Sequence, residues 1–236
     1  MSILLSERQG AILSLTLNRP EKANALSTEL IEALHLAFQS AEKAADLLVI
    51  TLTGVGGNFC SGADTDEFKK GAEGRRRAVE GYCELVQSIQ QFSKPFLVGV
   101  EGGAVGGGLG LVALADLVIA SEKAHFRTPE LTLGLFPFII SPLLVPVIGK
   151  KHFFEMVYTG RPVGSDQARE WGLVNEVVTS EMLGGSLFSL AGLIAKAPLE
   201  TLQRGKRTVR EGPSFQKLGE ELLALLGRSP LHPPKP

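Results

Sequence analysis

Four glycines lie within five positions of the stretch AVGGGLGLVALAD (104–116), directly ahead of an apolar run that is typical of a helix. Glycine inside a helix costs up to about 1 kcal/mol relative to alanine. A packing or functional requirement must therefore outweigh that cost at Gly106, Gly107, Gly108 and Gly110. Three groups could need such a close approach of the backbone: a phosphate, a neighbouring helix or strand, or a reacting carbonyl.

The phosphate interpretation has weak support in the sequence. Gly108-x-Gly110-x-x-Ala113 partly matches a dinucleotide-binding fingerprint. The helix that follows is short, and the next apolar segment, 117–120, does not end in the acidic residue that a ribose would need. The chain also contains no G-x-x-x-x-G-K-[ST] loop. We therefore disfavour a nucleotide cofactor.

A second glycine-rich loop, GVGGNFCSGAD (54–64), also runs from an apolar strand-like segment towards the start of a helix. Two such loops can each direct a free backbone N–H towards one spot, and helix N-termini add positive potential there. Paired N–H donors stabilise a thioester carbonyl oxygen as it becomes an enolate. Close packing of helix and strand backbones is the alternative explanation of the glycines.

Several motifs, in order, resemble those of the crotonase, or enoyl-CoA hydratase/isomerase, superfamily over about residues 3–210. They are NRPEKANAL (18–26), FCSGAD (59–64), AVGGGLGL (104–111), RTPELTLGLFP (127–137) and YTGRPVGSDQAREWGLVNEVV (158–178). The resemblance implies an α/β fold with a ββα spiral core and an acyl-CoA thioester as substrate. It also implies a homotrimer or a dimer of trimers, with no metal and no cofactor other than the coenzyme A of the substrate.

By the same resemblance, the backbone N–H groups of Ala63 and Gly107 would form an oxyanion hole. Residues 61–65 would line the acyl-CoA site, and residues 22–25 would lie near the nucleotide and pantetheine of coenzyme A. The substrate-binding residues implied in this way are Lys22, Ala23, Ala25, Ser61, Gly62, Asp64, Thr65, Gly106, Gly110 and Pro129.

The resemblance also locates the acid–base chemistry. Family hydratases commonly carry two glutamates, and here the two positions hold Gly110 and Glu130. Hydration needs one group to activate water and another to manage the proton at the α-carbon, whereas moving a double bond from the 3- to the 2-position needs one carboxylate. The apolar residues after Glu130 would raise its pKa by desolvation; a solvated surface glutamate is the alternative. We therefore expect a 3-enoyl-CoA to 2-enoyl-CoA isomerase with Glu130 as the base, and retain a 2-enoyl-CoA hydratase and a non-catalytic acyl-CoA-binding subunit as alternatives.

Departures from the family pattern refine this expectation. The family's glycines after GL-P are here Phe138, Ile139 and Ile140, so the acyl end of the pocket should be bulkier and drier. No aspartate occurs in that stretch, which argues against the dienoyl-isomerase and dehalogenase branches. The C-terminal segment is shorter than usual for the family.

The elements that must position these residues follow from periodicity and turn signals. Strand and helix patterns alternate, which predicts an α/β fold with parallel pairing. We expect a crotonase-like core over residues 1–195 and a short helical segment over 196–236. The individual expectations are a hairpin within 3–20 that turns at 9–10, a helix from a Ser27 cap to about 44, a strand at 47–53, a helix through 68, a helix near 79–92, strands at 95–100 and 117–120, a short helix after the glycines, and a strand within 173–178.

The net charge and the composition limit which binding partners we expect. A net charge of −1 gives no reason to expect nucleic acid or an acidic membrane surface as a partner. The cations of residues 69–77 should form a solvated helix face, with contact to coenzyme A phosphates as the alternative. Cys60 and Cys83 form no metal-ligand pattern, and His125 is expected to be structural.

One apolar stretch could be mistaken for a membrane span. Residues 131–149 are uncharged and nearly long enough to cross a bilayer. Three prolines in that stretch would break the helix repeatedly, so we expect a buried segment instead. The N-terminal residues show no signal-peptide pattern, and a cytoplasmic protein is expected.

Overall fold

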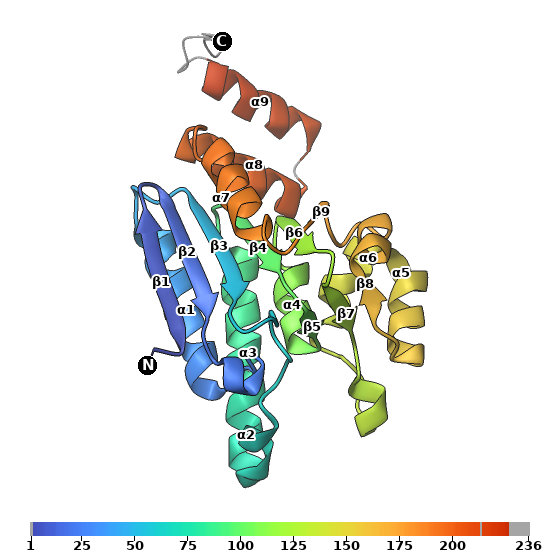
Figure 1. Cartoon of the computed structure of the whole chain (residues 1–236). Helices are drawn as coiled ribbons and strands as arrows, with labels where there is room; N and C mark the ends of the chain where they lie inside the picture. The colour runs from blue at the N-terminus through green and yellow to red at the C-terminus, as the bar shows by residue number, and fades with distance from the viewer. Residues whose placement is uncertain (1, 213, 227–236) are drawn as a thin grey trace.

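The computed structural model describes residues 2–212 and 214–226, and it folds them around two β-sheets (Figure 1). The larger sheet has six strands in the order β1-β2-β3-β4-β6-β9. β1 and β2 form an antiparallel hairpin, and every later pairing in this sheet is parallel. The strands are β1 (Leu4–Gln9), β2 (Ile12–Leu17), β3 (Val49–Gly54), β4 (Phe96–Val100), β6 (Leu117–Ser121) and β9 (Glu176–Val178).

The smaller sheet contains β5 (Gly103–Val105), β7 (His125–Arg127) and β8 (Val163–Gly164). Two isolated parallel bridges extend it: Cys60 pairs with Ala104, and Leu26 pairs with Ala63. The segment 60–63 is therefore held between β5 on one side and the segment before the first long helix on the other. This small sheet joins the two glycine-rich loops.

Helices cover both faces of the larger sheet, and alternation along the strands decides which side chains meet them. α1 (Thr28–Lys43) and α3 (Gly71–Gln91) pack with Ile50, Leu52 and Val98 in the main core, whereas α7 (Leu183–Ile194) packs on the opposite face against Val49 and Leu97. The remaining helical elements are η1 (Pro20–Lys22), α2 (Thr65–Lys69), α4 (Gly107–Ala113), η2 (Glu130–Leu133), α5 (Ser141–Thr159), α6 (Ser165–Glu170), α8 (Leu199–Glu211) and α9 (Phe215–Leu226).

Most expected elements are confirmed, and one helix boundary is wrong. The hairpin turns at Gly10, and the Ser27 hydroxyl caps α1 by accepting a hydrogen bond from the Leu30 amide at 3.3 Å. α3, however, begins at Gly71 rather than near residue 79. Its first turns are polar and contain glycine, which hides them from hydrophobic periodicity. Ion pairs of i,i+4 spacing, Glu73 with Arg77 and Arg76 with Glu80, support them instead.

The expectation that residues 131–149 are buried is wrong for its first half. Leu133 is 68% exposed and Phe138 is 77% exposed, because they lie on η2 and on the loop that follows it. Entry into the core begins at Ile140, directly before α5, and continues along that helix with Leu144 and Ile148. α5 tolerates a proline in its first turn and bends at Gly149, which has non-helical backbone angles. Within the described ranges, no helix is both long enough and apolar enough to cross a membrane.

α8 docks on the core through polar contacts. The Lys206 ammonium donates to Asp116 Oδ2 at 2.6 Å and to the Lys94 carbonyl at 2.9 Å. Gln203 donates to the Ser93 hydroxyl at 2.7 Å. α8 buries no side chain fully, so it adds little to the hydrophobic core. The division of the chain at residue 195 stays a prediction.

Asn24 holds the loop before α1 against the loop after β3. Its side chain accepts from the Arg19 amide at 2.8 Å and donates to the carbonyls of Val55 at 2.9 Å and Asn58 at 2.8 Å. Asn24 is completely buried and has a positive φ of 56°. Asparagine tolerates that backbone conformation better than most residues.

We expect Asn24→Ala to lower the free energy of unfolding by about 2–4 kcal/mol, because it leaves three partly buried backbone groups without their side-chain partner. Urea denaturation of the two proteins measures this difference. Asn18→Ala is the control, because Asn18 donates a single exposed hydrogen bond to Ser2. That variant should stay within about 1 kcal/mol of the parent. Equal losses in the two variants would contradict the role given to Asn24.

Candidate active site

A cavity of about 680 Å³ lies where the two glycine-rich loops meet η2. Ala63, Gly107 and Glu130 all line it, although they are far apart in the sequence. The rest of its wall is mainly apolar and comes from the start of α1, from α2 and α3, and from the stretch 134–140. Two backbone segments that can offer amides therefore face the same space as one carboxylate.

Hydrogen bonding along segment 60–64 leaves the Ala63 amide unused. Cys60 donates to Gly103 and accepts from Val105, both at 2.9 Å, which ties the segment to β5. On the other edge, Leu26 donates to the Gly62 carbonyl at 2.8 Å and accepts from the Asp64 amide at 3.1 Å. Neither of these two sets of backbone hydrogen bonds includes the Ala63 N–H, which has no acceptor within the described part of the chain.

The Gly107 amide is free for a different reason. Gly107 is the first residue of α4, and the first N–H groups of a helix have no acceptor within it. It follows directly on β5, the strand to which segment 60–63 is tied. An ideal Cβ on Gly62 would lie 3.5 Å from the Gly107 nitrogen. The segment that carries the Ala63 amide therefore runs beside the start of α4.

Two glycines make this approach possible. Gly62 has a φ of +90°, and a Cβ at that position would lie 2.8 Å from the Val105 carbonyl oxygen. Gly106 has a φ of +51°, and its Cβ would lie 3.0 Å from Glu130 Oε1. A side chain at either position would need both an unfavourable backbone conformation and space that is already filled. Both glycines are thus required where the cavity meets the backbone.

Glu130 is the first residue of η2 and directly follows Pro129. Its Oε2 atom is buried and has no hydrogen-bond partner among the described residues. Desolvation by burial raises the pKa of this carboxyl above its ordinary value. The alternative of a solvated surface glutamate therefore does not describe this side chain. A partly desolvated, unpaired carboxylate in a cavity is suited to accepting a proton.

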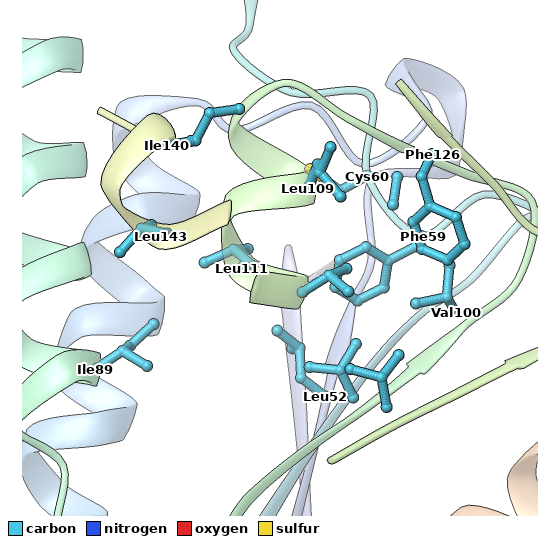
Figure 2. Packing of buried hydrophobic residues seen from close by; sticks show 14 of the residues in the cluster. Leu52, Phe59, Cys60, Ile89, Val100, Leu109, Leu111, Phe126, Ile140 and Leu143 are labelled. Carbon is cyan, nitrogen blue, oxygen red and sulfur yellow. The ribbon is translucent and has the colours of Figure 1, made fainter. Parts of the chain in front are cut away.

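The other two glycines of the cluster are required by packing. A Cβ on Gly108 would lie 2.6 Å from the Cys60 carbonyl oxygen. Figure 2 shows how closely α4 packs against this segment, with the side chain of Leu109 beside Cys60. Gly110 lies beneath Tyr82 and Ile140. The close-packing explanation of the cluster thus holds at two of its four positions.

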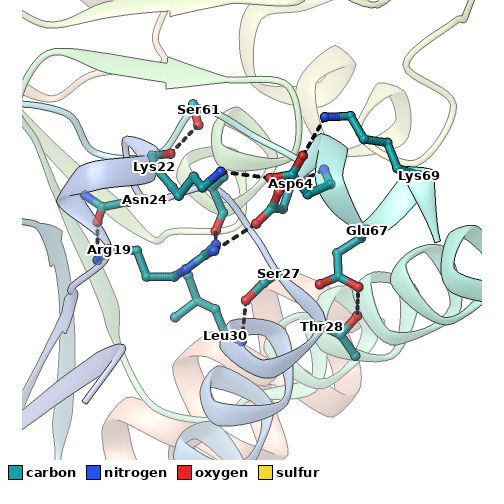
Figure 3. Close-up of polar contacts among 12 residues, drawn as sticks. Arg19, Lys22, Asn24, Ser27, Thr28, Leu30, Ser61, Asp64, Glu67 and Lys69 are labelled. Atoms are coloured by element: carbon teal, nitrogen blue, oxygen red, sulfur yellow. Dashed lines mark hydrogen bonds and ion pairs between the residues drawn. The ribbon is translucent and has the colours of Figure 1, made fainter. Parts of the chain in front are cut away.

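A polar network holds the loop 19–25 against the segment 61–66 (Figure 3). Arg19 and Asp64 form a largely buried ion pair at 2.8 Å. Asp64 also caps α2 by accepting from the Asp66 amide at 3.0 Å. The side chain of Asp64 is therefore occupied in holding the segment in place, and its backbone is bonded as well, through its amide to the Leu26 carbonyl and through its carbonyl to the Glu67 amide.

The other predicted binding residues of these two segments are in part exposed and in part buried. Lys22 forms an ion pair with Asp66 at 2.8 Å and is half exposed. Ala23 accepts from the Ser61 amide at 3.0 Å. Along the next segment Ser61, Ala63 and Thr65 are exposed, whereas Gly62 and Asp64 are buried. Ala25 is also buried, so its side chain faces the core rather than this surface.

The basic residues of 69–77 form short-range ion pairs on exposed helix surfaces. This arrangement supports a solvated helix face for most of the stretch. The pairs are Lys69 with Asp66 at 2.7 Å, Lys70 with Glu67 at 2.9 Å, Arg76 with Glu80 at 2.8 Å and Arg77 with Glu73 at 3.1 Å.

Burial also decides the role of Cys60. It raises the pKa of the Cys60 thiol to about 12, which leaves this group protonated and unreactive near neutral pH.

The motifs and their spacing do not predict the side chains that α2 and α3 contribute to the cavity. Phe68, Val79 and Tyr82 line it, and the Tyr82 hydroxyl donates to the Gly107 carbonyl at 2.6 Å. Spacing alone could have placed Tyr82 on the buried face of α3, since Ala78, Tyr82 and Val86 recur every four residues. It could not have shown what Tyr82 touches.

Comparison with known proteins agrees with this geometry. A model of the enoyl-CoA hydratase/isomerase family matches residues 7–223. The 2,3-dehydroadipyl-CoA hydratase of Escherichia coli is 34% identical over 214 residues, which cover 89% of this chain and 83% of that protein. The mitochondrial enoyl-CoA hydratase domain-containing protein 3 of Danio rerio is 33% identical over 208 residues, covering 87% and 72%.

Solved structures show the same relationship. An enoyl-CoA hydratase from Bacillus anthracis superposes with a TM-score of 0.89 at 29% identity, covering 96% of this chain and 90% of the other. An enoyl-CoA hydratase/isomerase from Marinobacter aquaeolei superposes with a TM-score of 0.87 at 28% identity, covering 97% and 92%. The expected crotonase-like α/β fold is thereby confirmed. The chain belongs to the enoyl-CoA hydratase/isomerase, or crotonase, family and is an enzyme that acts on an acyl-CoA.

Proposed function

We propose that this enzyme moves the double bond of a 3-enoyl-CoA to the 2-position, with Glu130 as its single acid–base group. The observation that carries the proposal is the composition of the cavity wall. Among the described residues that line it, Glu130 is the one carboxylate, and its Oε2 atom is unpaired. Position 110, where family hydratases commonly carry a second glutamate, is a glycine covered by other side chains. One proton-transfer group suits an isomerisation better than the addition of water.

In the proposed reaction, the thioester oxygen accepts hydrogen bonds from the amides of Ala63 and Gly107. Glu130 removes a proton from C2, and the electron pair of the broken C–H bond moves into a dienolate whose charge lies on that oxygen. Glu130 then returns the proton to C4, which leaves the double bond between C2 and C3. The amide donors stabilise charge that develops during the reaction, so their effect falls on the rate rather than on substrate binding.

The substrate would lie along the segment 61–65, with its coenzyme A portion towards residues 22–25. Support comes from the exposure of Ser61, Ala63 and Thr65 and from the half-exposed Lys22 side chain on the neighbouring loop. The apolar wall formed by Phe136, Phe138 and their neighbours suits a hydrocarbon acyl chain.

The assembly proposed for this chain is a homotrimer or a dimer of trimers. Support comes from the large apolar side chains that a single copy leaves exposed on and after η2: Leu133, Leu135 and Phe138.

Hydration of a 2-enoyl-CoA is the second candidate. The names of the relatives favour it, since the Escherichia coli and Bacillus anthracis proteins above are both called hydratases. In this reaction Glu130 would have to act with a water molecule that no second carboxylate activates. Assays on both substrates distinguish the two candidates.

We expect the purified protein to convert a 3-enoyl-CoA into a conjugated 2-enoyl-CoA, detected by the rise in conjugated-enoyl absorbance. Glu130→Gln should lower this rate by at least about 100-fold, because the amide cannot accept the C2 proton. Binding of the acyl-CoA, measured by calorimetry, should change by less than about threefold, since the contacts with coenzyme A remain.

Glu101→Gln is the matched control, because Glu101 also has a buried Oε2 without a described partner but does not line the cavity. It should retain the parental rate. Loss of absorbance from a 2-enoyl-CoA, without isomerisation, would replace the proposal with the hydratase. Binding without either reaction would identify an acyl-CoA-binding subunit.

The reaction should lose rate on the acid side at a pH above the ordinary glutamate pKa of 4.5. Burial raises the pKa of Glu130, and only its ionised form can remove a proton, so kcat/KM falls as the pH drops through that raised value. A pH–rate profile on a 3-enoyl-CoA measures the midpoint. A midpoint at or below 4.5 would contradict the assignment.

The same raised pKa predicts that Glu130→Gln stabilises the folded protein near neutral pH. A folded-state pKa above the unfolded value means that the ionised carboxylate destabilises the fold at pH values above both. Replacement by neutral glutamine removes this cost. The gain should shrink as the pH falls through the raised pKa and vanish below 4.5, where both states are protonated. Denaturant titrations of parent and variant at several pH values check this; a gain that is independent of pH would contradict it.

A further inference from the structure

Tyr82 occupies a position in the cavity that neither the acid–base group nor the amide donors explain. It lies on α3 with 8% of its surface exposed, and it lines the cavity together with Glu130, Gly107 and Ala63. Its hydroxyl donates to the Gly107 carbonyl at 2.6 Å. The hydroxyl proton is thus directed at the first turn of α4, whose amide is a proposed donor to the thioester oxygen.

Gly110 lies directly under this phenol. An ideal Cβ at position 110 would overlap the Tyr82 hydroxyl oxygen, and it would lie 2.6 Å from Cγ2 of Ile140. Gly110 lies within α4 and does not have a positive φ, so its backbone conformation does not require glycine. Space alone requires it. Tyr82 and Ile140 together fill the volume into which any side chain at 110 would project.

This filled volume has a chemical consequence, because a side chain at 110 would extend from α4 towards Tyr82, which itself lines the cavity. The Tyr82 phenol cannot act as a second base in the cavity. Burial raises the pKa of Tyr82 far above its ordinary value, so the group stays protonated, and its proton is already donated to a backbone carbonyl. The Cγ2 methyl of Ile140 is apolar and cannot hold a water molecule.

We propose that Tyr82 is a specificity-determining residue: with Ile140 it keeps a second acid–base group out of position 110 and so directs the site towards proton transfer and against hydration. This inference deepens the proposed function and rests on it. It makes Tyr82 and Gly110 an interdependent pair, in which the large side chain from α3 requires the absence of one from α4.

The test is a double-mutant cycle of Gly110→Glu and Tyr82→Ala. Alone, Gly110→Glu should lower Tm by more than about 5 °C, because the new side chain overlaps the phenol. Added to Tyr82→Ala, the same change should cost less than half as much. Val79→Ala is the matched control, since Val79 lines the cavity from the same helix but is not among the nearest contacts of a Cβ at Gly110. It should not relieve the cost. Equal costs of Gly110→Glu in all three backgrounds would overturn the pairing.

The second readout is the ratio of the hydration rate on a 2-enoyl-CoA to the isomerisation rate on a 3-enoyl-CoA. The combined variant Tyr82→Ala with Gly110→Glu should raise this ratio at least about tenfold over the parent, because a second carboxylate gains access to the cavity. Tyr82→Phe keeps the ring and removes one oxygen, which leaves too little room for a carboxylate, so its ratio should stay within about threefold of the parent.

A coupled Tm cycle with an unchanged ratio in the combined variant would overturn the specificity role. A parent protein that does not isomerise a 3-enoyl-CoA would instead contradict the proposed function, and the stability cycle would still decide whether Tyr82 closes position 110. The two failures are therefore distinguishable.

Discussion

The site depends on the contact between segment 60–63 and the turn from β5 into α4. Cys60 bonds to β5 on both sides of Ala104, and this contact brings the Ala63 and Gly107 amides to the same cavity. The contact tolerates almost no side-chain volume. Gly62 faces the Val105 carbonyl and Gly108 faces Cys60, both at distances that a Cβ would make too short. Gly62 is required by its positive φ and by this contact, whereas the helix propensity lost at Gly108 is offset by close packing against Cys60.

The Glu130 carboxylate lies beside the same turn, and its partial burial there destabilises the folded protein when the group is ionised. Glu130 Oε1 lies beside Gly106, while Oε2 is buried without a described partner. Folded proteins normally pair such atoms, and leaving one unpaired in a partly desolvated position destabilises the ionised form. The polar network around Arg19, Asn24 and Asp64 shows the opposite arrangement, because these buried groups are bonded to backbone or to each other. The chain therefore satisfies its polar groups where they hold the loops, and leaves one unsatisfied in the cavity.

Sequence reasoning predicted the parts of the fold that depend on local patterns. The hairpin, the Ser27 cap, the strands at β4 and β6 and the short helix after the glycines all follow from periodicity and turn residues. β5 was missed because three residues carry too little pattern, and the start of α3 was missed because its first turns are polar. The exposure of Leu133 and Phe138 could not be predicted, since hydrophobicity favours burial but does not determine whether the fold provides it.

The candidate site, like the fold, could be predicted from the sequence only in part. The motifs were enough to predict Ala63, Gly107 and Glu130, and the structure places all three around one cavity. Motifs could not explain why position 110 is a glycine, because the reason lies 28 residues earlier in the chain, at Tyr82 on α3. The four glycines of one short motif therefore contact different neighbours: Glu130 at 106, Leu26 at 107, Cys60 at 108 and Tyr82 at 110. Membership in a family specifies the fold and the acyl-CoA class of substrate, whereas in our proposal the choice between reactions depends on which side chains fill the space beside position 110.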